Sequence, residues 1–187
     1  MNRYVKGTIL FLWLFMCFFI FSCKANAVIS KTNDKEDNTG KRVYFAAALF
    51  NEMEREYNLR IASILTSYGY DVFMPQRDGY EEKELKGKTQ EEITELIFKK
   101  DIEEIEKADI LFAILDGAVP DEGMCVEIGI AYAKGKRCYG LRNDMRTSER
   151  GFDLNIMITG CCEKIFNDED YEKMIDSLKD YLSKNKL

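Results

Sequence analysis

The sequence predicts an open α/β sheet covered by helices, and three observations lead to this fold class. From residue 42 onward, short apolar runs alternate with segments of helical periodicity, an order typical of βαβ units. The runs are apolar at successive positions, as in parallel strands that are buried on both faces. The 187 residues leave room for one domain of roughly 100–200 residues. We therefore expect residues 42–187 to form a single flavodoxin-like domain with a five-stranded parallel sheet flanked by helices.

Four strands of this sheet are predicted from apolar runs, and no run is assigned to the fifth. The four runs cover residues 43–50, 70–75, 109–115 and 137–141. Ligands of open α/β sheets bind beyond the carboxyl ends of the strands. We therefore expect the chemistry of the protein in the loops that follow Phe50, Pro75 and Leu115.

Amphipathic helices are predicted between and after the strands. Apolar residues recur at helical spacing in three segments, which indicates one buried face on each. A fourth helix is expected over residues 124–134, ended by Gly135, because glycine commonly follows the last residue of a helix. The three apolar faces consist of Tyr57, Ile61, Ile64, Leu65 and Tyr68; of Ile93, Leu96, Ile97 and Ile105; and of Tyr171, Met174, Ile175, Leu178 and Leu182.

The composition excludes several kinds of chemistry. The chain contains no histidine, so Ser-His-Asp triads, Cys-His pairs and histidine-ligated zinc are excluded. Its 6 cysteines form no CxxC pair, which argues against a structural zinc site. A net charge of −6 without a basic stripe argues against nucleic acid as a partner. We expect neither a metal nor a cofactor, so acid–base chemistry falls to carboxylates, Tyr, Lys or Cys.

The first 22 residues have the pattern of a secretory signal peptide. Arg3 and Lys6 precede an apolar run over residues 9–21, which is shorter than the roughly 20 residues of a membrane-spanning helix. Residues 20–23 (IFSC) resemble a bacterial lipobox, and cleavage there would leave Cys23 as the lipidated first residue. Residues 25–27 (ANA) have the small-x-small form of an ordinary cleavage site. An uncleaved membrane anchor is the remaining alternative.

A flexible tether is predicted over residues 23–41, because residues 31–41 are almost entirely polar. Lipidation of Cys23 predicts a membrane-anchored lipoprotein of the bacterial cell envelope. Ordinary cleavage predicts a secreted or periplasmic protein instead.

One acidic residue lies on a helix face that is otherwise apolar. Asp101 is four residues after Ile97 and four before Ile105, so it belongs to the stripe expected to face the sheet. Burying an ionised carboxylate costs several kcal/mol unless the group is paired or opens to a ligand pocket. Asp101 is therefore a candidate site residue. The alternative is that the helix is rotated or ends near Lys100, which would leave Asp101 exposed or at an N-cap.

Glu127 is a second acid on an inner face, that of the helix predicted over residues 124–134. Its place near the helix start, where the dipole favours an anion, should help keep it ionised and nucleophilic. A cap or a dipole partner is the alternative interpretation. Asp121 lies just upstream, in the loop after the third predicted strand. Acid–base and nucleophilic catalysis is therefore predicted for the three carboxylates Asp101, Asp121 and Glu127. Glycosyl transfer is the reaction that such carboxylates suit best.

At these residues the sequence resembles the nucleoside 2-deoxyribosyltransferase family. Residues 121–131 match the family's Asp-x-Gly-x-x-x-Glu-φ-Gly-x-Ala element, and Asp101 keeps the family's separation of 20 residues from Asp121. Residues 43–47 resemble the opening strand with its tyrosine, and residues 75–79 resemble the loop after the second strand. Residues 155–157 resemble an Asn-x-Met segment that reaches into a neighbouring subunit's pocket. The resemblance extends from residue 42 to about residue 157.

The resemblance implies a role for each matched residue. Glu127 would attack C1′ of a 2′-deoxynucleoside and form a covalent deoxyribosyl-enzyme, with Tyr44 orienting the glutamate. Asp101 would help protonate the departing base, and Asp121 would hold a sugar hydroxyl together with Asn155. The resemblance also implies a homo-oligomer. The implied substrate-binding residues are Gln76, Asp78, Gly123, Asn155 and Met157.

Base exchange between a nucleoside and a free nucleobase is the reaction that the resemblance implies, and two alternatives remain open. An N-glycoside hydrolase of deoxynucleotides or nucleosides would use the same glutamate with water as acceptor. The candidates for binding the phosphate of a nucleotide in such a hydrolase are Arg77, Arg142 and Arg146. The other alternative is a catalytically inactive lipoprotein that binds a ligand, because a fold alone does not establish activity.

Overall fold

The computed structural model describes residues 40–144, 146, 154–185 and 187. The chain divides into two units, Met1–Glu36 and Asp37–Leu187. The predicted signal peptide, Cys23 and nearly all of the predicted tether lie outside the described residues, whereas the predicted domain lies within the second unit. No helix of the described part is long and apolar enough to cross a membrane.

The second unit is built on a five-stranded parallel sheet, which confirms the predicted fold class. Its order is β2-β1-β3-β4-β5, so the direction of winding reverses at β1. Loops leave such a switch point on opposite sides and open a crevice between them. The strands are β1 (Arg42–Ala46), β2 (Asp71–Phe73), β3 (Ile110–Ile114), β4 (Arg137–Arg142) and β5 (Lys164–Asn167).

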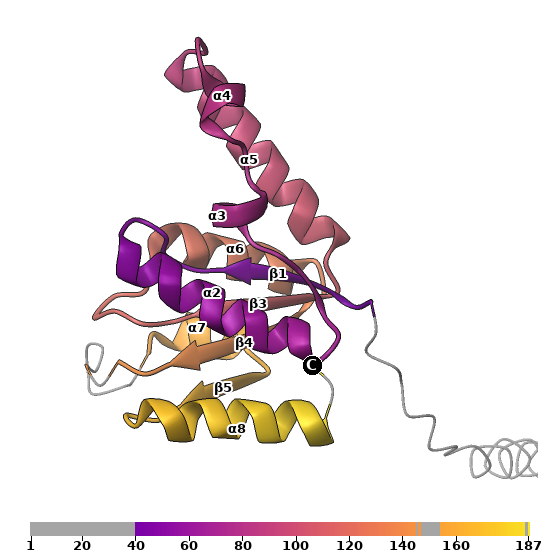
Figure 1. Cartoon of the computed structure of the whole chain (residues 1–187), viewed down its shortest axis with the longest axis vertical. Helices are drawn as coiled ribbons and strands as arrows, with labels where there is room; N and C mark the ends of the chain where they lie inside the picture. The colour runs from indigo at the N-terminus through magenta and orange to yellow at the C-terminus, as the bar shows by residue number, and fades with distance from the viewer. Residues whose placement is uncertain (1–39, 145, 147–153, 186) are drawn as a thin grey trace, which may run out of the picture. The chain divides into compact units, whose positions relative to one another are not determined.

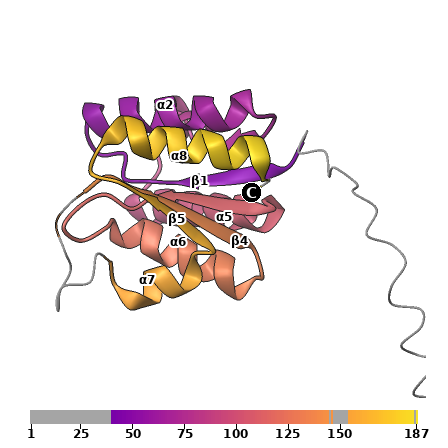
Figure 2. The same ribbon diagram turned by 90° about the horizontal axis from the view of Figure 1, so that it is seen from below.

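Helices cover both faces of the sheet (Figure 1). Figure 2 shows α2 (Glu52–Ser67) and α8 (Tyr171–Lys184) on one face, with α5 (Gln90–Lys107), α6 (Glu122–Ala133) and α7 (Ile156–Cys161) on the other. Because side chains alternate along a strand, β1 contributes to two cores. Val43 and Phe45 pack with α2 and α8, whereas Tyr44 and Ala46 pack with α5 and α6.

Capping side chains determine where two of the principal helices begin. The Asn51 side chain accepts a hydrogen bond from the backbone N–H of Glu54, and the Glu54 carboxylate accepts one from the backbone N–H of Asn51. This reciprocal box starts α2. Asp121 starts α6, because its Oδ1 accepts from the backbone N–H of Met124 at 2.8 Å. The helix stops before Gly135, whose φ of 73° suits the predicted glycine stop.

β1 is shorter than the strand predicted over residues 43–50. Its ladder with β2 ends at the pair of Tyr44 and Phe73, and its ladder with β3 ends at Ala46. The following residues leave the sheet as a loop that ends at Phe50, which is 76% exposed. The loop stays apolar because it lines a pocket, so its hydrophobicity resembles that of a buried strand.

Four short elements are absent from the sequence prediction. The edge strand β5 has 4 residues, of which two are only half-buried, and such a run is too short to stand out from its polar neighbours. The helices α3 (Pro75–Asp78), α4 (Glu82–Leu85) and α7 have one or two turns each. A helix of that length has too few residues to show a period.

α5 runs without a break from Gln90 to Lys107, so the alternative in which it ends near Lys100 is wrong. Its carboxyl-terminal part packs against the sheet, where Ile105 is 1% exposed. Its amino-terminal part extends past the sheet together with α4 (Figure 1). The predicted apolar face is therefore buried only in part, and Ile97 is 41% exposed.

Candidate active site

A pocket of about 380 Å³ opens beyond the carboxyl ends of β1, β2 and β3, where the sequence predicts a site. This volume lies in the range of roughly 300–1,000 Å³ that holds small-molecule ligands. Its walls are formed by the loop after β1, the segment around α3, the middle of α5 and the start of α6. The apolar part of the wall consists of Ala47, Leu49, Phe50, Pro75, Tyr80, Ile97 and Met124.

The three carboxylates that the sequence groups together meet in this pocket. Asp101 reaches it from the middle of α5, and Asp121 and Glu127 reach it from the start and the second turn of α6. The stripe that contains Asp101 therefore faces the pocket at Asp101 and the core at Ile105. Gly123, which is predicted to bind substrate, also lines the pocket.

Tyr44 holds Glu127 in place from the sheet. Its hydroxyl donates a hydrogen bond to Glu127 Oε1 at 2.7 Å, and its side chain is 0% exposed. Burial, reinforced by the charges of Glu127 and Asp101, raises the pKa of Tyr44. The phenol therefore keeps its proton and acts only as a hydrogen-bond donor to the carboxylate.

Burial raises the pKa of Glu127 to about 7, with further contributions from the charges of Asp101 and Asp121. The hydrogen bond from Tyr44 opposes this rise. The expectation that the helix start keeps Glu127 ionised is therefore wrong in direction. Glu127 is the sixth residue of α6, beyond the first turn in which the dipole is effective. The alternative in which Glu127 is the cap is also wrong, because Asp121 occupies that position.

Burial also raises the pKa of Asp101, against the effects of the Tyr44 hydroxyl and the charge of Lys100. Two half-buried carboxylates beside one phenol disfavour a state in which both are ionised. The pair of Asp101 and Glu127 therefore holds one proton to higher pH than two exposed carboxylates would. An ionised carboxylate beside a protonated one is the arrangement that provides a nucleophile and a general acid together.

Two residues predicted to bind substrate, Gln76 and Asp78, are not part of the pocket wall. Gln76 Oε1 accepts a hydrogen bond from Asn58 Nδ2 at 2.9 Å. Asp78 Oδ2 accepts from the backbone N–H of Met74 at 2.8 Å and forms an ion pair with Arg77. Both side chains stabilise the loop after β2, and their direct contact with substrate stays a prediction.

Asn155 and Met157 also lie outside the pocket wall of their own chain. Asn155 caps α7, where its Oδ1 accepts from the backbone N–H of Met157 at 2.9 Å. Met157 is 73% exposed. The predicted contribution of both residues to a neighbouring subunit's pocket stays a prediction.

The three arginines considered for a phosphate bind protein groups instead. Arg142 is 1% exposed, and its Nη1 donates to the carbonyl oxygen of Leu115 at 2.5 Å. Arg77 pairs with Asp78, and Arg146 pairs with Asp144. None of the three belongs to the pocket wall. Within the described ranges, no group of three or more acidic or cysteine side chains is placed to hold a metal ion.

Sequence reasoning missed several residues of the pocket wall. Leu49 and Phe50 are hidden in a run that is read as a strand, and Tyr80 follows the short helix α3. Lys100 lines the pocket next to Asp101 in the sequence. Its position beside a candidate acid is the one signal that could have indicated it.

The reversal of winding at β1 opens a crevice beyond the strands, and the carboxylates gathered there are of the kind that reactions at glycosidic bonds use. The model of the nucleoside 2-deoxyribosyltransferase family matches residues 43–157, and the chain belongs to this family. Membership supports an enzyme of the class that comprises nucleoside pentosyltransferases and N-glycosidases.

Solved structures share the fold. A conserved protein from Enterococcus faecalis V583 has 23% sequence identity and a TM-score of 0.63, and the match covers 78% of this chain and 98% of that chain. A 2-deoxyribosyltransferase from Bacillus psychrosaccharolyticus has 27% identity and a TM-score of 0.55, covering 71% and 95%. One from Leishmania mexicana has 17% identity and a TM-score of 0.53, covering 77% and 98%. Among curated proteins, no sequence matches the chain.

Proposed function

We propose that the protein transfers 2-deoxyribose from a 2′-deoxynucleoside to a second nucleobase through a covalent intermediate on Glu127. The observation that carries the proposal is the contact of 2.7 Å from the Tyr44 hydroxyl to Glu127 Oε1, in a pocket that Asp101 also lines. This contact leaves the second carboxylate oxygen of Glu127 available for C1′ of the sugar.

In the first half-reaction, ionised Glu127 forms a bond to C1′ as the C1′–N bond of the nucleoside breaks. The electron pair of that bond passes to the base nitrogen. The base takes the proton of Asp101 either on that nitrogen or on another nitrogen of its ring. A carboxylate that bonds to the anomeric carbon and a carboxyl group that protonates the leaving group are the pair used in retaining glycoside chemistry.

In the second half-reaction, a nitrogen of the incoming base attacks C1′ and displaces the Glu127 carboxylate. Its proton returns to Asp101, so the enzyme ends in its starting state. Two displacements at C1′ restore the original configuration of the sugar. Water in place of the incoming base completes a hydrolysis instead. In both half-reactions we assign Asp121 to hold a sugar hydroxyl.

Product analysis tests the proposal. The purified protein is incubated with deoxyinosine or deoxyadenosine as donor and with uracil or cytosine as acceptor, and the products are separated by chromatography. Deoxyuridine or deoxycytidine is expected. Free base and free deoxyribose in the presence of an acceptor would make the protein a hydrolase. No reaction with nucleosides or with their 5′-monophosphates would favour a binding protein.

Tyr44→Phe is expected to move the acidic limb of the pH profile of kcat/KM to higher pH. The Tyr44 hydrogen bond lowers the pKa of Glu127, so its loss raises that pKa above about 7. A smaller fraction of Glu127 is then ionised, and we expect kcat/KM at pH 6 to fall about tenfold. Tyr57→Phe is the matched control, because the buried Tyr57 hydroxyl has no hydrogen-bond partner among the described residues. An unmoved limb in Tyr44→Phe would contradict the assignment.

A homo-oligomer is proposed in which Asn155 and Met157 complete the pocket of a partner subunit. Three side chains on α6 and α7 favour such contact, because Val126, Ile156 and Met157 are 58%, 66% and 73% exposed although they are apolar. Light scattering gives the oligomeric state. Mixing inactive Glu127→Gln with inactive Asn155→Ala protein should restore part of the activity, and a monomer without recovery would refute the shared site.

Lipidation of Cys23 and attachment to the bacterial cell envelope are proposed from the sequence pattern alone. Cells that express the chain are labelled with a radioactive fatty acid, and the protein is located by fractionation. We expect label in the wild type and none in Cys23→Ser. A released, unlabelled wild-type protein that begins after residue 27 would establish ordinary secretion.

A further inference from the structure

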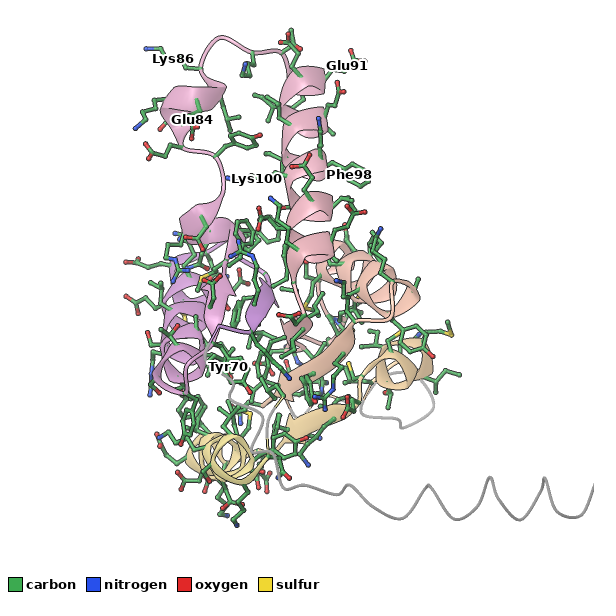
Figure 3. The ribbon with its side chains drawn as sticks, turned by 90° about the vertical axis from the view of Figure 1, so that its right-hand side faces the viewer. Tyr70, Glu84, Lys86, Glu91, Phe98 and Lys100 are labelled. Atoms are coloured by element: carbon green, nitrogen blue, oxygen red, sulfur yellow. The ribbon has the colours of Figure 1, made fainter. Side chains whose placement is uncertain are left out.

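Lys100 brings a positive charge into a pocket whose other charged groups are carboxylates. Among the described residues of the pocket wall, it is the one basic side chain. It precedes Asp101 on α5 and is half-buried. Figure 3 shows Lys100 between α5 and the segment that joins α3 to α4. The mechanism described above gives this residue no role.

The Lys100 ammonium group is held in a defined position. Its Nζ donates a hydrogen bond to the backbone carbonyl oxygen of Asp78 at 2.6 Å. It also lies 4.7 Å from the ring centroid of Tyr80 and 5.9 Å from that of Phe73, within reach of cation–π attraction. A lysine ammonium has three N–H donors. The carbonyl contact uses one, so the group retains donors for a ligand while its position is fixed.

The residues around Lys100 indicate which part of the substrate it would contact. Pro75, Tyr80 and Ile97 form an apolar wall at its side, which suits a planar heterocycle. Asp121 and Glu127 lie on α6, and in the proposed reaction they meet the sugar. Lys100 is thus placed at the nucleobase end, beside the acid that serves the departing base.

We propose that Lys100 selects nucleosides whose base carries a keto oxygen at the position where other bases carry an exocyclic amino group. Hypoxanthine, guanine, thymine and uracil present such an oxygen, whereas adenine and cytosine present an amino group there. An ammonium group only donates hydrogen bonds. It can therefore donate to the keto oxygen, whereas an amino group at the same position is itself a donor and cannot accept from it. An amino group at this position removes that hydrogen bond and sets two donors against each other, which disfavours the wrong ligand. The inference rests on the proposed function.

The same contact assists the bond-breaking step. As the C1′–N bond breaks, part of the electron pair received by the base spreads to its keto oxygen. The hydrogen bond from Lys100 strengthens as that charge develops. An interaction that is stronger in the transition state than in the bound substrate raises kcat.

The test compares deoxyinosine with deoxyadenosine, two nucleosides that differ in the group at position 6 of the purine and in the proton on the neighbouring N1. We expect the wild type to favour deoxyinosine, and Lys100→Met to reduce the ratio of the two kcat/KM values by about tenfold or more. Lys100→Arg keeps the charge and the donors and should keep most of the ratio. Lys99→Met is the matched control, because Lys99 is 72% exposed and pairs with Glu103.

The ratio separates recognition of the base from other effects of the substitution. Loss of the positive charge changes the pKa of Asp101, and loss of the contact with Asp78 changes the packing of α5. Both effects change the two kcat/KM values in the same direction, whereas loss of the contact with the keto oxygen acts on deoxyinosine alone. A ratio that is unchanged in Lys100→Met, or reduced equally in Lys99→Met, would overturn the proposal.

Calorimetry with the free bases separates this proposal from the proposed function. Hypoxanthine should bind the wild type more tightly than adenine does, and Lys100→Met should remove the difference. If the wild type cleaves no nucleoside but shows this Lys100-dependent binding, deoxyribosyl transfer fails and base selection stands. If it transfers deoxyribose from both nucleosides to an acceptor base with no dependence on Lys100, base selection fails and transfer stands. The absence of both cleavage and binding would refute both.

Discussion

Glu127→Gln is expected to lower the rates of base release and base exchange by at least about 10³-fold, and Glu127→Ala should abolish both. A neutral amide cannot supply the carboxylate that bonds to C1′. Glutamine has nearly the same shape, and its side-chain oxygen can still accept the hydrogen bond that Tyr44 makes to Glu127 at 2.7 Å. A loss of this size corresponds to about 4 kcal/mol of transition-state stabilisation. Initial rates with saturating nucleoside measure it.

Glu122→Gln is the matched control, since Glu122 is exposed on the same helix and should leave the rates unchanged. Mass spectrometry of the wild type with nucleoside and no acceptor should detect one deoxyribosyl group on a peptide that contains Glu127. A Glu127→Gln enzyme that keeps a rate within tenfold of the wild type would exclude covalent catalysis by this residue.

The interior of the sheet is predictable from sequence, whereas its ends are not. Ile110, Leu111 and Phe112 are all at most 1% exposed, and such continuous burial produces the apolar run that predicts β3. Leu49 and Phe50 extend the first run in the same way but line a pocket. Hydrophobicity indicates that a side chain avoids water and does not indicate whether protein or ligand covers it.

The candidate acids are predictable because they interrupt apolar patterns. Asp101 stands between Ile97 and Ile105, and the structure places it in the pocket. The direction of the pKa shift of Glu127 is not predictable in this way. It depends on burial, on the charge of Asp101 from α5 and on the hydrogen bond from Tyr44 of β1. Both residues become neighbours of Glu127 only when the chain folds.

Pairings between distant residues also limit what sequence reasoning can assign. Gln76 is expected at the substrate, but its oxygen accepts from Asn58 of α2. Arg142 is considered for a phosphate, but it is buried against the carbonyl of Leu115. In both cases the residue type suits the predicted ligand. The side chain is instead hydrogen-bonded to a group from another part of the fold.

Asp101→Asn is expected to lower kcat/KM for natural nucleosides by about 10²- to 10³-fold, the usual contribution of a general acid. The amide cannot transfer a proton to the departing base. A 2-deoxyriboside with 4-nitrophenolate as leaving group needs no such proton, so the variant should cleave it at a rate close to that of the wild type. Glu103→Gln on the exposed side of α5 is the control for the substitution of an acid on this helix.

The pH profile of Asp101→Asn should lose its alkaline limb. In the wild type, activity requires one protonated and one ionised carboxyl group, so kcat/KM falls on the alkaline side as the pair loses its last proton. The variant keeps one titrating carboxyl group, that of Glu127, so its kcat/KM should rise through the pKa of Glu127 and then stay level. The charge of ionised Asp101 raises the pKa of Glu127, and asparagine carries no such charge, so this rise should lie below about pH 7. Tyr44→Phe should move the limb that Glu127 controls to higher pH, so the two variants together test whether one phenol and two carboxylates share the reacting proton. An Asp101→Asn profile that keeps its alkaline limb would show that another group protonates the base.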